Sequence, residues 1–279
     1  MLRVRILALV TAVGLLLSAT PASAAQVHGY LALGDSVAFG FDPRVVAAGG
    51  ASDPSNFVGY PEALARVLPL RLTNASCPGE ASGGFISLAS PLDNGCRGYR
   101  SVFPLHVSYG TSQLDFAIAY VRAHPRAKLI TIDLGANDLF LLQRACGGES
   151  GCVLAGLPAL LATLRGNLQT IYARLRDDGG FHGRLVALSY YPLDYRDPTQ
   201  VAVISAINGV VASVTTAQPA GFVADGFTAF AAASGPAGSP CAAGLLIRLS
   251  ATTCDVHPSP AGQDVLARAI RAVVRAPGD

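Results

Sequence analysis

The 279-residue sequence has no tryptophan, and only 14% of its residues are charged. The net charge of +2 is close to neutral and no block of like charge occurs, so we expect no nucleic-acid partner and no binding to an anionic membrane surface. Sugar rings usually stack on aromatic side chains, tryptophan above all, so the lack of tryptophan disfavours a polysaccharide substrate. Neither GxGxxG nor GxxxxGKS/T is present, which disfavours a nucleotide-binding protein.

The N-terminus has the pattern of a secretory signal peptide. Two arginines precede an apolar run over residues 6–17, and small residues, Ala22 and Ala24, follow in an A-x-A arrangement. The run is short for a membrane span. We therefore expect residues 1–24 to be removed and residues 25–279 to form a single secreted, extracellular domain.

The cysteines fit export. There are six, all in the predicted mature chain, and an even number in an oxidising compartment predicts three disulfides. Each consecutive pair brackets one loop-like stretch, which favours the pairs Cys77–Cys96, Cys146–Cys152 and Cys241–Cys254. A zinc site is the alternative, but no CxxC occurs and CDVH alone is a poor ligand set. We expect no metal and no other cofactor.

Short apolar runs alternate with helical stretches along the chain. Continuous apolar runs, typical of parallel strands covered on both faces, occur at 30–33, 70–76, 128–135, 184–191 and 221–227. Helices are predicted over 60–68, 112–124, 157–178, 198–217 and 259–276. Long loops are expected over 41–58, 77–110, 143–156 and 228–256. This order predicts one doubly wound α/β domain, in which ligands bind beyond the carboxyl ends of the strands.

Ser36 follows the first predicted strand, in the run LGDS, and so stands at that edge. A serine hydroxyl is a weak nucleophile without a base. Of the five histidines, His257 is favoured because it directly precedes the last predicted helix and Pro258 restricts its backbone to extended or turn geometry. Asp255, two residues earlier, is the candidate acceptor that orients the histidine.

Acyl transfer also needs donors for an oxyanion. Gly79 follows the second predicted strand and offers an unshielded backbone N–H, and Asn137 follows the third and offers a side-chain amide. Taken alone, Gly79 is a turn glycine and Asn137 a helix N-cap. Because both follow strands of one sheet, we expect both to face the same cleft as Ser36.

Other residues near these motifs receive structural or binding interpretations. Asp35 is interpreted as a turn or buried hydrogen-bonding residue, and Asp138 as an acid in the first turn of a helix. The candidates for lining an apolar acyl site are loop aromatics, namely Phe57, Phe85, Phe103 and Tyr109.

Four motifs in order, LGDSVAFG, NASCPGEASGG, LGANDLF and DVHPSPAGQ, resemble those of the GDSL, or SGNH, hydrolases. The resemblance is to the secreted, disulfide-containing esterases and lipases of actinobacteria. It implies an α/β, flavodoxin-like three-layer α/β/α sandwich with a five-stranded parallel sheet ordered 2-1-3-4-5. It also implies metal-independent ester hydrolysis, with Ser36 as nucleophile, His257 as general base, and the N–H of Ser36, Gly79 and Asn137 as oxyanion donors.

One feature departs from the family. The family carries its acid three residues before the histidine, where this chain has Cys254, so either Asp255 completes a triad or Ser36 and His257 act as a dyad. We expect a secreted serine esterase or lipase acting on a small-molecule or lipid ester, as a monomer without stable membrane insertion. A sugar O-acetylesterase or a phospholipase on the same scaffold is the alternative, and a catalytically silent binding protein is less favoured.

Overall fold

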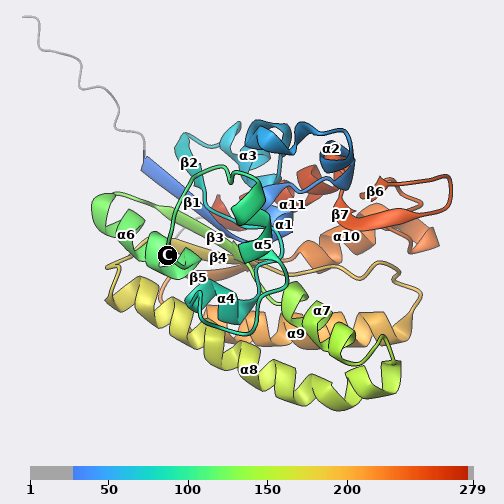
Figure 1. Cartoon of the computed structure of the whole chain (residues 1–279). Helices are drawn as coiled ribbons and strands as arrows, with labels where there is room; N and C mark the ends of the chain where they lie inside the picture. The colour runs from blue at the N-terminus through green and yellow to red at the C-terminus, as the bar shows by residue number, and fades with distance from the viewer. Residues whose placement is uncertain (1–27, 276–279) are drawn as a thin grey trace, which may run out of the picture.

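The computed structural model describes residues 28–275, which form a five-stranded parallel sheet between two layers of helices (Figure 1). The strand order is β2-β1-β3-β4-β5, which confirms the predicted fold class and order. The strands are β1 (His28–Gly34), β2 (Leu70–Asn74), β3 (Leu129–Asp133), β4 (Arg184–Leu188) and β5 (Gly221–Ala224). The predicted signal peptide, residues 1–24, lies outside the described residues.

One face of the sheet packs on a layer of three long helices. Leu31 and Leu33 of β1 and Ile130 of β3 point to this face and are buried. Figure 1 shows α8 and α9 along this side of the molecule. The helices of the layer are α6 (Gln113–Ala123), α8 (Ser150–Asp177) and α9 (Pro198–Thr216).

The opposite face forms a second core. Because side chains alternate along a strand, Tyr30 and Ala32 of β1 and Val186 of β4 point to this side. Parallel strands covered on both faces are apolar throughout, which explains why the sequence shows them as continuous runs. The helices here are α3 (Tyr60–Ala65), α10 (Gly226–Ser234) and α11 (Pro260–Val274).

The long loops expected from the sequence are wrong in detail, because each holds short elements. These have too few residues to show a helical or strand period, and two of them begin after a capping aspartate, Asp42 or Asp53. They are α2 (Pro43–Ala47), η1 (Gly50–Ser52), η2 (Pro54–Asn56), α4 (Ser82–Ile86), α5 (Cys96–Val102), η3 (Gly235–Ala237), β6 (Leu246–Arg248) and β7 (Cys254–Pro258).

The expected loop over 143–156 is replaced by two helices and a tight turn. Helix α7 (Ala136–Ala145) ends there, and α8 begins at Ser150, well before the predicted start at residue 157. Proline favours the first turn of a helix, which is why the sequence places the start beside Pro158. In the structure that proline lies inside the helix.

Three disulfides join consecutive cysteines: Cys77–Cys96, Cys146–Cys152 and Cys241–Cys254. The first links the segment after β2 to the start of α5. The second closes the turn between α7 and α8, and the third links the segment before β6 to β7. Each therefore fixes a connection at the carboxyl side of the sheet.

Helices α8 and α9 are long and apolar enough, by length and composition alone, to cross a membrane. Core helices of soluble proteins pass the same test. Leu164 and Leu168 of α8 and Ile207 of α9 are buried against the sheet. The absence of stable membrane insertion stays a prediction.

Candidate active site

Ser36 stands on a sharp turn at the end of β1. Gly34 has φ +126°, a conformation that favours glycine, and a Cβ at this position would lie 2.2 Å from Oδ1 of Asp133. Asp35 then caps the short helix α1 (Ser36–Phe39) by accepting the N–H of Val37 at 2.8 Å. This turn places Ser36, half-buried, at the first position of α1 beyond the carboxyl end of the strand.

Side chains from distant elements hold α1 in place. The N–H of Ala38 donates to Oδ2 of Asp133 at 3.2 Å. Nδ2 of Asn74 donates to the Ala38 carbonyl at 2.9 Å, and Nε2 of Gln263 donates to the Val37 carbonyl at 3.0 Å. A four-residue helix has little stability of its own, so these contacts from β2, β3 and α11 fix its position.

His257 lies in strand β7 rather than in a loop. Residues two apart in a strand share a face, so Asp255 stands beside the histidine. One carboxylate oxygen, Oδ1, accepts the His257 backbone N–H at 3.0 Å and also contacts Nδ1 of the ring. Burial opposes ionisation of Asp255, but hydrogen bonding and charge from His257 outweigh it and lower the Asp255 pKa. The acceptor at Nδ1 is therefore a side-chain carboxylate, not a backbone carbonyl.

The strand that carries His257 is supported on three sides. The imidazole centroid lies 4.9 Å from the ring centroid of Phe41. The hydroxyl of Tyr191 donates to the Val256 carbonyl at 3.0 Å. At the start of β7, the disulfide Cys241–Cys254 ties the strand to the segment before β6. Together these contacts limit movement of the histidine backbone.

Asn137 lies in the first turn of α7 and is 3% exposed. The N-cap of this helix is Gly135, so the alternative reading of Asn137 as the cap is wrong. Its Nδ2 donates to Oδ2 of Asp35 at 3.0 Å, and its Oδ1 accepts Nδ2 of Asn94 at 2.7 Å. Arg144 in turn donates to Oδ1 of Asn94. This chain of donors and acceptors fixes the amide orientations and uses only one of the two Asn137 N–H groups.

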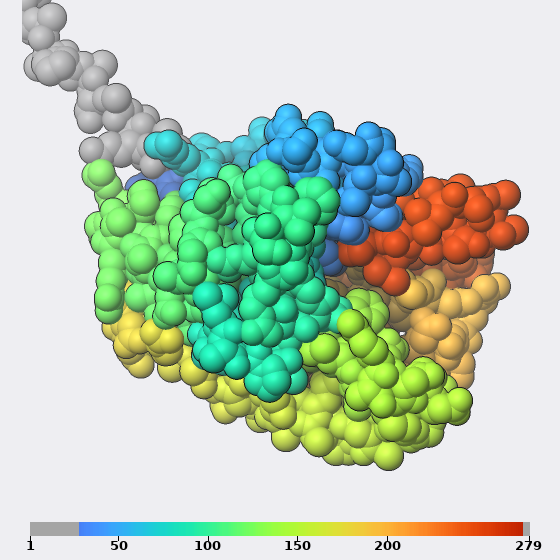
Figure 2. All heavy atoms as spheres, in the orientation of Figure 1, coloured from blue at the N-terminus to red at the C-terminus, as the bar shows by residue number. Residues whose placement is uncertain are grey.

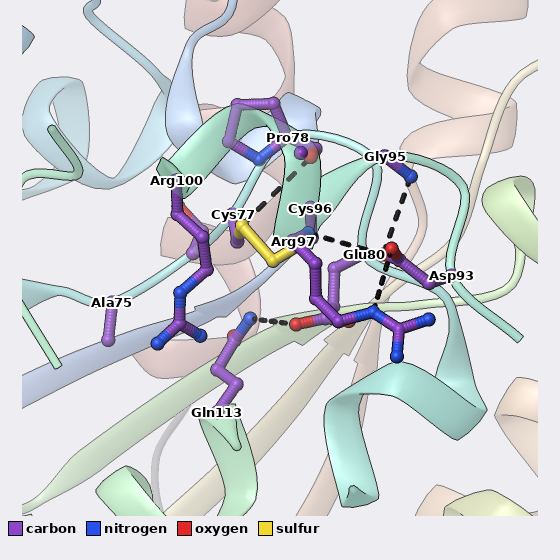
Figure 3. Close-up of a disulfide and its surroundings, with 12 residues drawn as sticks. Ala75, Cys77, Pro78, Glu80, Asp93, Gly95, Cys96, Arg97, Arg100 and Gln113 are labelled. Carbon is purple, nitrogen blue, oxygen red and sulfur yellow. Dashed lines mark hydrogen bonds and ion pairs between the residues drawn. A yellow bond between two sulfur atoms is a disulfide. The ribbon is translucent and has the colours of Figure 1, made fainter. Parts of the chain in front are cut away.

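Gly79 is connected to Asn137 through Asn94. The backbone N–H of Asn94 donates to the Gly79 carbonyl at 3.1 Å. Gly79 has φ +82°, and a Cβ there would lie 2.8 Å from the Asn94 carbonyl oxygen. Within residues 28–275 the Gly79 N–H has no hydrogen-bond acceptor. In the sequence, both residues lie between Cys77 and Cys96, whose disulfide is drawn in Figure 3.

Glu80, next to Gly79, is a buried acid. Nε2 of Gln113 donates to Glu80 Oε2 at 3.3 Å (Figure 3). The same amide pairs with the backbone N–H and carbonyl of Gly34. Burial raises the pKa of Glu80 to about 8. Its ligand atoms cluster with those of Cys77 and Cys96, but the two sulfurs are bonded to each other and offer no thiolate to a metal.

Ser36, Asn137 and His257 line one pocket of about 520 Å³, whereas Gly79, expected to face the same cleft, is not among its lining residues. Figure 2 shows the surface hollowed between the yellow-green α7 region and the orange-red C-terminal segments. Within the described residues, no hydrogen bond joins the Ser36 hydroxyl to Nε2 of His257; such bonds often tighten only when substrate binds. The apolar walls come from α7, α8, the segment after β4, and α9: Leu139, Phe140, Val153, Leu154, Leu193, Val203 and Ile204.

The loop aromatics expected to line an acyl site do not line this pocket. Phe57 packs on Phe39 with ring centroids 5.0 Å apart, and Phe85 belongs to the core with α6 and α8. The hydroxyl of Tyr109 donates to the Ala75 carbonyl. The ring of Phe103 packs on Tyr99 with ring centroids 5.4 Å apart. These four aromatic rings therefore pack against other parts of the protein and not along the cleft.

Sequence reasoning missed several residues that support the site. Asn94, Tyr190 and Gln113 come from segments that carry no motif. Only the folded chain brings Asn94 to Asn137, Tyr190 to Asp35 and Gln113 to Gly34. Asp133 gave a signal, because it is an acid inside an otherwise apolar strand.

The chain was compared with known proteins. Residues 32–265 match the GDSL-like Lipase/Acylhydrolase family. The comparison with curated proteins gave no match.

Among solved structures, a phospholipase A1 from Streptomyces albidoflavus NA297 is similar with 17% identity and a TM-score of 0.57, covering 88% of this chain and 99% of its own. An acetylxylan esterase from Geobacillus stearothermophilus has 17% identity and a TM-score of 0.55, covering 90% and 95%. A lipase from a goat rumen metagenome has 16% identity and a TM-score of 0.53, covering 88% and 97%. At these identities the likeness shows the fold.

Proposed function

The chain belongs to the GDSL-like lipase/acylhydrolase family and is a carboxylic ester hydrolase, and we propose that it uses a Ser36–His257–Asp255 triad. The observation that carries this proposal is the contact of the Asp255 carboxylate with Nδ1 of His257, whose ring lines the same pocket as Ser36. A carboxylate at Nδ1 leaves Nε2 of the neutral imidazole free to accept a proton. The departure from the family's acid spacing is then accommodated by the strand, which puts residues 255 and 257 on one face.

In the proposed mechanism the hydroxyl oxygen of Ser36 attacks the ester carbonyl carbon and His257 Nε2 takes the hydroxyl proton. The oxyanion is stabilised by the backbone N–H groups of Ser36 and Gly79 and by the second N–H of the Asn137 amide. His257 then protonates the leaving alcohol, which leaves an acyl-enzyme. Water attacks that ester with His257 again acting as base, and the carboxylic acid is released.

We propose an ester with an apolar acyl chain as the substrate. The pocket beside Ser36 has apolar walls from four segments. Two of its lining side chains, Leu154 and Leu193, are also 48% and 39% exposed to solvent. Burial of a hydrocarbon chain along such walls contributes about 25 cal/mol for each Å² removed from water. An acetyl group would leave most of a pocket of about 520 Å³ unfilled.

Residues 25–279 are proposed to be one secreted domain. Three disulfides occur within the described residues, and such bonds persist in oxidising compartments. Mass spectrometry of the protein from the culture medium of an expression host would test both points. A mature N-terminus at residue 25 or 26 and six oxidised cysteines are expected, whereas an uncleaved cell-associated chain would contradict export.

The esterase proposal is tested by hydrolysis of p-nitrophenyl acetate, butyrate and palmitate, with acetylated xylan and a phospholipid as further substrates. Ser36→Ala should abolish the activity, and Ser101→Ala, an exposed serine on α5, should not. Preference for butyrate or palmitate supports the apolar acyl site. Preference for acetylated xylan or for phospholipid would replace the substrate proposal, and activity that survives Ser36→Ala would overturn the triad.

A further inference from the structure

Two carboxyl groups are buried side by side beneath the nucleophile turn. Asp35 is 1% exposed and Asp133 is 0% exposed. In the sheet, Gly34 of β1 pairs directly with Asp133 of β3. Oδ1 of Asp133 occupies the space that a side chain at position 34 would need, 2.2 Å from the ideal Cβ. The glycine before Asp35 therefore makes room for the second acid.

The hydrogen bonds around Asp35 are those of an ionised carboxylate. Its Oδ1 accepts the N–H of Val37 at 2.8 Å. Its Oδ2 accepts the amide of Asn137 at 3.0 Å and the hydroxyl of Tyr190 at 2.7 Å. An ionised carboxylate has room for about four donors, so one site remains.

Asp133 supplies the fourth partner. It accepts the N–H of Ala38 at 3.2 Å and the hydroxyl of Tyr60 at 3.0 Å, and its carboxyl lies beside that of Asp35, close enough for the two groups to interact. A hydrogen bond between two carboxyls requires a proton on one of them. Within residues 28–275, no lysine or arginine hydrogen bonds to either acid, so two ionised groups in contact would be strongly disfavoured.

The balance of contacts puts the proton on Asp133. Burial raises the pKa of Asp35, but the hydrogen bonds from Asp133, Val37 and Tyr190 oppose that rise. Burial, followed by the charge of Asp35, raises the pKa of Asp133 well above its usual range. Of the two acids, Asp133 therefore favours the protonated form more strongly.

We propose that Asp133 is a positioning residue that stays protonated and donates to Asp35, so that the pair holds the Asn137 amide and helix α1 in the geometry that oxyanion binding needs. The inference rests on the proposed role of Asn137 as an oxyanion donor. Asp133 touches no reacting atom. It acts through Asp35 on Asn137, and through the N–H of Ala38 on the helix that carries Ser36.

The pair predicts a pH dependence. Loss of the Asp133 proton would place two carboxylates in contact, displace Asp35 and release Asn137, so kcat should fall at alkaline pH. The titratable groups around the pair are Tyr30, Tyr60, Tyr190, Tyr191, Glu80, Asp138 and His257. The tyrosines keep their protons and remain neutral donors because burial raises their pKa values.

The test compares Asp133→Asn with Asp133→Ala. Asparagine can donate to Asp35 without a titratable proton, so Asp133→Asn should keep kcat close to that of the wild type and remove the alkaline fall. Asp133→Ala leaves the fourth site of Asp35 empty, and displacement of Asn137 should lower kcat about 10²-fold with little change in KM. A neutral-pH loss in folded Asp133→Asn as large as in Asp133→Ala would overturn the proposal.

A double-mutant cycle separates positioning from general destabilisation. In the Asn137→Ala background, Asp133→Ala should cost much less than in the wild type, because the amide it positions is gone. Tyr172→Phe removes a buried hydroxyl whose partner is Thr215 and provides the control, since its effect should be additive with Asn137→Ala. Additive effects for Asp133→Ala would contradict a role through Asn137.

Infrared spectroscopy tests the proton without reference to activity. The wild type at neutral pH should show a protonated-carboxyl stretching band that Asp133→Asn lacks. An unchanged band would overturn the proton assignment, even where Asp133→Ala does not fold. If Ser36→Ala kept full activity, the proposed function would fail, while this band would still decide whether Asp133 is protonated.

Discussion

The side-chain amide of Asn94 donates a hydrogen bond to Oδ1 of Asn137 across 2.7 Å. The backbone N–H of the same residue donates to the carbonyl of Gly79 at 3.1 Å. Asn94 therefore joins the two candidate oxyanion donors that lie outside the nucleophile turn. Its segment is bracketed by the Cys77–Cys96 disulfide, so the crosslink also limits movement of this bridge.

Replacement of Asn94 by alanine should lower kcat with little change in KM. The lost amide frees Asn137 to rotate about its side chain, and a small misplacement of an oxyanion donor costs about tenfold or more in rate. Steady-state kinetics on p-nitrophenyl butyrate measure the effect. Asn56→Ala, which removes an exposed side-chain amide that donates to the Gly50 carbonyl, is the matched control and should leave kcat nearly unchanged. An equal effect of the two variants would contradict a bridging role.

The sequence predicts the five strands and their order along the chain, because buried parallel strands are mostly apolar, although four of the predicted strands extend two or three residues too far. It also predicts the start of α11, where Ser259 caps the helix and Pro260 follows. The sequence did not predict the short helices, because a single helical turn is too short to show a hydrophobic period. The residues that support the site were not predicted for a different reason. Tyr190 donates to Asp35, which lies 155 residues away in the sequence, and no local pattern encodes such a contact.

The pocket walls show the same limit. Aromatic residues in the long loops are reasonable candidates for an apolar site, yet Phe57 and Phe85 are buried in hydrophobic cores and do not reach the pocket. Val203, which lines the pocket, comes from a predicted helix whose apolar residues are typical of ordinary core, and Val153 falls in the stretch expected to be a loop.

Replacement of Asp255 distinguishes a triad from a dyad. An asparagine at this position would hold His257 in the wrong tautomer, and the comparable change in a serine protease lowers kcat about 10⁴-fold. We expect a loss of similar order for Asp255→Asn and a large loss for Asp255→Ala. Asp264→Asn, at an exposed acid on α11, is the control. Less than a threefold loss in both Asp255 variants would indicate that Ser36 and His257 act as a dyad.

Leu154→Glu should reduce activity on long acyl esters more than on short ones. The side chain lines the pocket and is 48% exposed, so the substitution adds charge to the acyl path without opening the core. Loss of one apolar wall contact predicts a decrease of about tenfold in kcat/KM for palmitate, and a smaller one for acetate. Leu249→Glu, at 50% exposure and outside the pocket lining, should keep the palmitate-to-acetate ratio. Equal ratios in the two variants would place the acyl chain elsewhere.

The free energy of unfolding of Glu80→Gln should exceed that of the wild type by an amount that grows as pH rises. Burial raises the folded-state pKa of Glu80 from an ordinary value of 4.5 to about 8. The protonated folded state is favoured below pH 4.5, and that contribution is lost progressively as pH rises to about 8, because the unfolded chain ionises first. Glutamine keeps a polar partner for Gln113 and has no proton to lose.

The difference in free energy of unfolding between Glu80→Gln and the wild type should therefore grow between pH 5 and pH 8 and level off above it. Urea unfolding at a series of pH values measures it, and subtraction of the wild-type curve removes the contributions of Asp133 and Asp138, whose pKa values are also raised by burial. Glu149→Gln, at an exposed glutamate, should give a curve parallel to the wild type. A parallel curve for Glu80→Gln would mean that Glu80 is already ionised in the folded protein, with a proton donor holding its charge beside Gly79.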